Sequence, residues 1–188
     1  MKRFLQLLLF FPLVAAAKTP VEQDIIDRTL DSSSPYYHTA LMMRYNAGDR
    51  TMTDDDYHYL YYGYAYQDGY KPLAANPELD KLLLLVSGLD PDKPDRAVLE
   101  SVISTGRDVL ARDPFSPNVL NLMAFAYDAL GDKEQAAAFS ARMNGVLRAI
   151  LASGDGLTQK TPRHVLMFDH ALDAMDVEGL AYGKARII

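Results

Sequence analysis

The chain has 188 residues with 25 acidic and 19 basic side chains, a net charge of −6, and no cysteine. The acidic balance argues against nucleic acid or an anionic membrane surface as a partner. Without cysteine the protein has no disulfide, no cysteine nucleophile and no thiolate zinc site.

The first seventeen residues have the three parts of a cleavable secretory signal peptide. A positively charged start, Lys2 and Arg3, precedes an apolar stretch and then three alanines that end at Ala17, as in a small-residue cleavage site. The stretch from Phe4 to Ala17 is fourteen residues long, whereas a membrane-spanning helix needs about twenty. We therefore expect cleavage near Ala17, leaving residues 18–188 as a single periplasmic or secreted domain with no membrane insertion.

Two short helices are expected at the start of this domain. The first follows Pro20, and its helical spacing directs three apolar residues inward: Ile25, Ile26 and Leu30. A run of serines before Pro35 ends it. The second helix is expected from His38 to Asn46, where a Gly-Asp turn follows.

A tyrosine-rich helix is predicted to begin at Thr53. This threonine is the expected N-cap, and Asp56 lies three positions later, as a capping box requires. The carboxylates of residues 54–56 also favour the positive end of a helix dipole. Because consecutive helical residues point in different directions, the acidic triplet is predicted to stabilise the helix and not to bind a metal.

Seven tyrosines lie between Tyr57 and Tyr70. At about 100° per residue, three of them share one side of a helix: Tyr57, Tyr61 and Tyr64. This stripe has two interpretations. It is either a set of large core residues with hydroxyls bonded at the edge of the core, or an exposed aromatic platform for a peptide or a sugar. Burial is favoured, because aromatic stripes at helical spacing usually belong to a core.

Four further helices are expected, each bounded by proline or glycine. They cover 76–89, 98–110, 118–130 and 133–151. After Ser153 the pattern changes, and 164–168 and 180–188 are predicted to be short strands or irregular chain. The predicted fold class is therefore mostly α, with stacked helical hairpins and an irregular or β-containing tail over 153–188.

The segment from Leu120 to Ala136 resembles a tetratricopeptide repeat. Large residues, a small partner, an aromatic residue, a turn glycine and a second-helix alanine follow one another: Leu120, Met123, Ala124, Tyr127, Gly131 and Ala136. The small residues let two helices approach, and the large ones fill the space around them. The resemblance implies a ligand groove that includes the three tyrosines above and four residues of the later helix: Asn118, Asn121, Phe125 and Asp128. Their polar groups suit an extended peptide, but no basic cluster is present there for a C-terminal carboxylate.

A search for catalytic patterns finds no nucleophile elbow, Walker loop, dinucleotide fingerprint or paired-histidine zinc helix. His164 and His170 would lie about 20 Å apart on a strand and about 120° apart on a helix, so neither geometry unites them at one metal. A folded-back tail offers a second site, with one histidine as a general base beside Asp155 or Asp169. Histidines that only fix the tail through hydrogen bonds are favoured. No cofactor or metal is expected.

Three stretches resemble a family of exported bacterial proteins known as domain of unknown function 4919. They are 35–49, with Pro-Tyr-Tyr and Ala-Gly-Asp; 57–64, with Leu-Tyr-Tyr-Gly-Tyr; and 154–170, with Gly-Asp-Gly and two histidines. After His170 the family often has Glu and Tyr, whereas Ala and Leu follow here. The resemblance implies export and a fold, and it implies no chemistry.

The function predicted from the sequence is a non-enzymatic, exported helical module for protein interaction or scaffolding, placed in a Gram-negative periplasm. A protein or peptide is the expected partner. One alternative is a small enzyme or carbohydrate binder that joins the helix Tyr57–Tyr70 to the tail His164–His170. Another is a structural subunit of an envelope assembly, which predicts a contiguous apolar patch on the surface.

Overall fold

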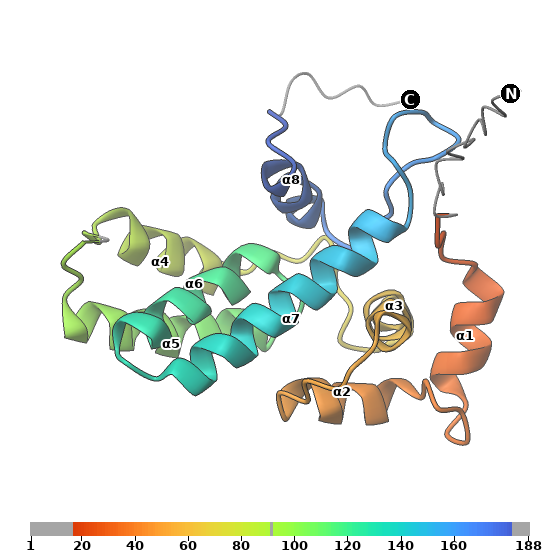
Figure 1. Cartoon of the computed structure of the whole chain (residues 1–188), viewed down its shortest axis with the longest axis horizontal. Helices are drawn as coiled ribbons and strands as arrows, with labels where there is room; N and C mark the ends of the chain where they lie inside the picture. Colours follow the sequence, from red (N-terminus) through yellow and green to blue (C-terminus); the bar gives the residue numbers. More distant parts are fainter. Residues whose placement is uncertain (1–16, 91, 182–188) are drawn as a thin grey trace, which may run out of the picture.

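The computed structural model describes residues 17–90 and 92–181, and the described chain is helical with no strand (Figure 1). The prediction of a mostly α fold is confirmed. A 3₁₀ turn, η1, spans Tyr64–Tyr66. The α-helices are α1 Glu22–Leu30, α2 His38–Asn46, α3 Asp54–Gly63, α4 Pro77–Ser87, α5 Arg96–Leu110, α6 Pro117–Ala129, α7 Lys133–Ala152 and α8 Phe168–Val177.

Local signals set most of these boundaries. Thr53 and Asp56 form the predicted capping box, with the Asp56 amide 3.1 Å from Thr53 Oγ1 and the Thr53 amide 2.8 Å from Asp56 Oδ2. Asp95, Ser116 and Asp132 accept backbone N–H groups at the starts of α5, α6 and α7. Such caps act within one turn, so the sequence locates these helices without tertiary information.

The helices form two neighbouring groups joined by α7. Helices α4, α5, α6 and α7 pack each against the next, and α3 packs against α1, α2 and α7. In Figure 1 the long α7 runs from the α5–α6 layer to α3, which is seen end-on beside α1 and α2. Helix α8 contacts α6 and α7. The tyrosine-rich α3 is therefore enclosed by partners on several sides.

The hairpin of α6 and α7 carries the tetratricopeptide-like pattern. Its patterned side chains are all buried: Leu120, Met123, Ala124, Tyr127 and Ala136. Gly131 connects the two helices with a φ of 87°, which a residue with a side chain rarely adopts. The rings of Tyr127 and Phe139 stack across the hairpin with centroids 5.4 Å apart. The pattern thus describes the packing of this pair.

Close approach of α3 and α7 depends on a glycine. A β-carbon added at Gly145 would lie 2.2 Å from Cζ of the Tyr57 ring, well inside van der Waals contact. Gly145→Ala is therefore expected to lower the free energy of unfolding by about 1–3 kcal/mol, because the two helices must separate. Urea denaturation followed by circular dichroism measures this. Gly88→Ala is the control, since nothing lies within 4 Å of its added carbon; equal stability of the two variants would contradict the contact.

One predicted inward face is only partly right. Ile25 is buried, but Ile26 is half-buried and Leu30 is 51% exposed. Thr29 takes the inward position, four residues after Ile25, and its side chain meets Gly63 of α3. A nine-residue helix buries a narrow stripe, so a residue one position from Thr29 turns away from the core.

The tail also differs from the prediction. Residues 164–167 are irregular, which was one of the two alternatives, but α8 follows where no helix was expected. Its N-cap, Met167, makes no side-chain capping bond, so the local signal for a helix start is absent. The strand or irregular chain expected at 180–188 lies mostly outside the described residues, as does the signal peptide. Within the described residues, no helix has the length and apolar character needed to cross a membrane.

Candidate functional site

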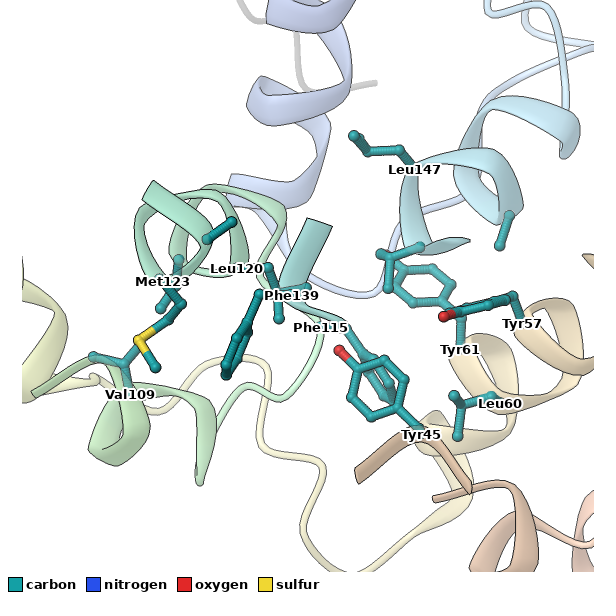
Figure 2. Close-up of a cluster of buried hydrophobic side chains, with 14 of the residues drawn as sticks. Tyr45, Tyr57, Leu60, Tyr61, Val109, Phe115, Leu120, Met123, Phe139 and Leu147 are labelled. Atoms are coloured by element: carbon teal, nitrogen blue, oxygen red, sulfur yellow. The ribbon is translucent and has the colours of Figure 1, made fainter. Parts of the chain in front are cut away.

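The tyrosine stripe of α3 lies inside the protein. Tyr57, Tyr61 and Tyr64 are 5%, 0% and 8% exposed, so the core interpretation is correct and the stripe forms no exposed platform. Figure 2 shows Tyr57 and Tyr61 extending from α3 into the cluster that holds Tyr45 and Phe115. The hydroxyls bond to backbone carbonyls or to a histidine, as buried tyrosines require. Tyr59 and Tyr62, outside this stripe, are also buried, because α3 has neighbours on more than one side.

Tyr61, His170 and Asp113 form a hydrogen-bonded chain. Tyr61 Oη lies 2.8 Å from His170 Nδ1, and His170 Nε2 lies 3.0 Å from Asp113 Oδ2. The Leu166 amide donates to Tyr61 Oη at 3.0 Å. Tyr61 Oη–H can therefore donate to His170 Nδ1, while His170 Nε2–H donates to the Asp113 carboxylate. Burial raises the pKa of Tyr61 well above its ordinary value, which keeps the hydroxyl protonated.

The hydrogen-bonded series Tyr61–His170–Asp113 has the order of an acid–base relay, but a substrate cannot reach its Tyr61 and His170 members. Tyr61 and His170 are both fully buried, and each of their polar side-chain atoms has a protein partner. The carboxylate end is more open: the Asp113 side chain is 19% exposed and lines a cavity of about 440 Å³ with Lys71 and Arg112. The hydrogen bond between Tyr61 and His170 joins the tail to α3, across 109 residues of sequence.

Helix α8 has a second polar attachment. The backbone N–H of Asn118, at the start of α6, donates to Asp173 Oδ2 at 3.0 Å. This places the carboxylate at the positive end of α6, where an anion is favoured. Burial raises the pKa of Asp173, and the bond from Asn118 partly offsets that effect. The two attachments of α8 thus reach Asp113, in the segment that connects α5 to α6, and Asn118, in the first turn of α6.

The four groove positions expected on α6 lie on the surface. Asn118, Asn121, Phe125 and Asp128 are exposed, and their spacing of three, four and three places them on one face of the helix. We call this face the α6 row. Asp128 pairs with Lys133 Nζ at 2.6 Å, and the other three side chains of the row carry no charge. The structure thus separates the α6 row, which is exposed, from the tyrosines of α3, which are not.

The second site expected in the tail is divided. Asp155 belongs to an exposed turn, where bonds from Thr161 and from the Leu157 amide lower the pKa of its carboxyl. His164 contributes its backbone: its amide donates to Ser153 Oγ at 2.8 Å and its carbonyl accepts from Tyr62 Oη at 3.0 Å. His170 instead faces Tyr61 and Asp113. The three residues therefore do not act on one group.

Asp113 is the member of the chain that sequence reasoning missed. In the sequence it appears as the aspartate of an Asp-Pro helix break, and its amide-binding role at Phe115 is local. Its bond to His170 spans 57 residues, and no local pattern indicates it. In the part of the chain that the structure describes, no three histidine or acidic side chains gather closely enough to hold a metal ion.

Comparison with known proteins gives one match. Residues 23–188 match a family model described as "Domain of unknown function (DUF4919)", which covers nearly the whole chain. No curated protein and no solved structure matches the chain. The matched region includes every helix of the fold except the first residue of α1.

Proposed function

The chain belongs to the DUF4919 family, and on that premise we propose that it is an exported, non-catalytic module that binds an extended peptide segment of a partner protein. The observation that carries this proposal is the α6 row. One face of α6 is buried against α5 and α7 in a tetratricopeptide-like hairpin, while the row on its other face stays exposed. An exposed, patterned face on a rigid helix pair is a suitable platform for a partner.

The chemistry of the α6 row suits a peptide backbone. The amides of Asn118 and Asn121 each donate and accept hydrogen bonds, which matches the alternating N–H and C=O groups of an extended chain. Phe125 is 36% exposed and adds an apolar contact for one side chain of the peptide. The row carries no basic side chain, so we expect it to bind an internal segment in preference to a C-terminal carboxylate.

Peptides selected from a random phage library on residues 18–188 provide the test. Binding of a labelled peptide is measured by fluorescence polarisation. The double variant Asn121→Ala with Phe125→Ala is expected to bind about tenfold or more weakly, because an anchor ring and a paired amide are lost. The matched control is Asn144→Ala, an exposed asparagine on α7. If the double variant and the control both bind the selected peptides with the affinity of the unaltered protein, the α6 row is not the binding surface.

Export agrees with the contacts that the first residues of the expected mature domain make. The Lys18 amide donates to the Ala152 carbonyl at 2.7 Å, and Thr19 Oγ1 donates to the Ser153 carbonyl at 3.1 Å. Lys18 also pairs with Asp55 of α3. These contacts begin one residue after the expected cleavage point, so removal of the signal peptide leaves them in place.

We expect the protein in a periplasmic fraction to begin at Lys18, as measured by intact mass. Leu8→Arg is expected to abolish processing, because a charge interrupts the apolar stretch that the export machinery requires. Leu157→Arg, at an exposed leucine of the mature domain, is the control and is expected to be processed normally. Normal processing of the Leu8→Arg protein would overturn the proposal of export by this segment.

A further inference from the structure

A second cavity, of about 490 Å³, lies between α2 and the layer formed by α5, α6 and α7. Its volume is in the range of small-molecule sites. The walls are mainly apolar and aromatic, and they come from segments far apart in the chain: Met42, Tyr45, Tyr64, Leu110, Leu120 and Phe139. Figure 2 shows Tyr45, Leu120 and Phe139 within the same cluster of side chains. The cavity is distinct from the α6 row and does not depend on the function proposed for that row.

Two arginines also line this cavity, Arg107 of α5 and Arg142 of α7. Arg142 donates from Nε to the Tyr45 carbonyl at 2.9 Å and from Nη2 to the Asn46 carbonyl at 2.8 Å. Its guanidinium carbon lies 4.7 Å from the Phe139 ring centre. Arg107 donates from Nη2 to Tyr127 Oη at 2.6 Å. These bonds use two of the five N–H donors of Arg142 and one of those of Arg107.

Neither guanidinium has a carboxylate partner among the described residues. Arg50 and Arg112 also have no carboxylate partner among the described residues, but neither of them lines this cavity. Five other arginines of the described chain do pair with carboxylates: Arg28, Arg44, Arg96, Arg148 and Arg163. The two unpaired guanidinium groups therefore give an apolar cavity a positive, hydrogen-bonding rim.

We propose that this cavity binds a small carboxylate with an apolar body. The carboxylate accepts hydrogen bonds from Arg107 and Arg142, and the apolar body packs against Tyr45, Tyr64 and Phe139. Guanidinium groups match a carboxylate in shape and charge, and low-dielectric walls strengthen that attraction. Both a free organic acid and the C-terminal carboxylate of a peptide with an apolar last residue have this chemistry.

Isothermal titration calorimetry on residues 18–188 distinguishes these sources. One arm compares octanoate with octanol, and the other compares acetyl-Gly-Ser-Phe as its free acid with the same peptide as its C-terminal amide. In at least one arm the acid is expected to bind about tenfold or more tightly than its neutral analogue, because a charge-assisted pair is lost in the neutral form. The arm that responds identifies the source of the carboxylate. If neither acid binds better than its neutral analogue, the proposal is wrong.

Arginine variants locate the binding. Arg107→Gln and Arg142→Gln are each expected to weaken binding of the acid that responds by about tenfold. The affinity for its neutral analogue is expected to stay unchanged. Arg148→Gln, on α7 but outside this cavity, is the matched control. Because Arg142 also bonds the end of α2, Arg107→Gln decides the outcome if the Arg142 variant does not fold. Unchanged affinity of the folded Arg107→Gln protein would overturn the assignment.

Discussion

His170→Ala is expected to lower the free energy of unfolding by about 3–5 kcal/mol and to release α8 from the rest of the fold. The substitution empties a fully buried position and leaves a buried hydroxyl and a partly buried carboxylate without their partner. A cavity of that size and two unpaired polar groups each have a large cost. Urea denaturation gives the loss of stability, and amide hydrogen exchange over residues 168–177 reports the release of α8.

Two variants test the cause of that loss. Tyr61→Phe removes one hydroxyl and keeps the ring. It is expected to lower the free energy of unfolding by about 1–2 kcal/mol, because His170 Nδ1 and the Leu166 amide lose their partner. His164→Ala is the matched control, since this histidine bonds through its backbone and is expected to change stability by less than about 1 kcal/mol. If His170→Ala is as mild as His164→Ala, the hydrogen-bonded chain does not hold the tail.

Acidification from about pH 7 to about pH 5 is expected to lower the free energy of unfolding by about 3–4 kcal/mol. Burial lowers the pKa of His38 from 6.5 to about 4, and a bond with the Leu60 carbonyl opposes this in part. Burial, with a smaller effect of Lys18, lowers the pKa of His58 from 6.5 to about 4, against the attraction of Asp55 and Asp24. Both histidines are therefore neutral in the folded protein over this interval.

The sign follows from where each state takes up protons. The unfolded chain protonates these histidines near pH 6.5, and the folded protein does so only near pH 4. As pH falls between these values the unfolded state gains stability, by about 2 kcal/mol for each histidine at pH 5. Urea titrations at several pH values measure the slope. In the double variant His38→Gln with His58→Gln the slope is expected to fall by more than half; an unchanged slope would assign the acid sensitivity to other groups.

Helix positions were largely predictable because their signals are local. The capping box of Thr53 and Asp56 and the helical spacing before Leu110 each act within a few residues. The start of α8 has no such signal, and it was missed. Its two buried residues, His170 and Ala174, are one turn apart and become an inward face only when α3 and α6 supply the opposing surface.

The candidate sites were less predictable. One alternative from the sequence joined the tyrosine helix to the histidine tail in one site. Tyr61 does meet His170, but inside the core instead of at a cleft. The helical spacing of about 100° per residue was enough to place Tyr57 and Tyr64 on one side of a helix. It did not determine whether that side faces solvent, because burial depends on the neighbouring helices. The exposure of the α6 row followed from the repeat-like pattern, and its peptide-binding role stays a prediction.

By itself, then, the amino-acid sequence determined the helical class, the positions of seven helices, the tetratricopeptide-like packing of α6 on α7, and the family resemblance. The predicted extension of the tyrosine-rich helix to Tyr70 is wrong, because α3 ends at Gly63 and only a 3₁₀ turn follows. The helix signals act within a few residues, and the pattern of the α6–α7 pair lies between Leu120 and Ala136. Only the tertiary structure decided the burial of α3, the link from Tyr61 through His170 to Asp113, and the placing of Arg107 and Arg142 at one apolar cavity. These depend on which distant segments the folded chain brings together, and a local hydrophobic period does not specify that path.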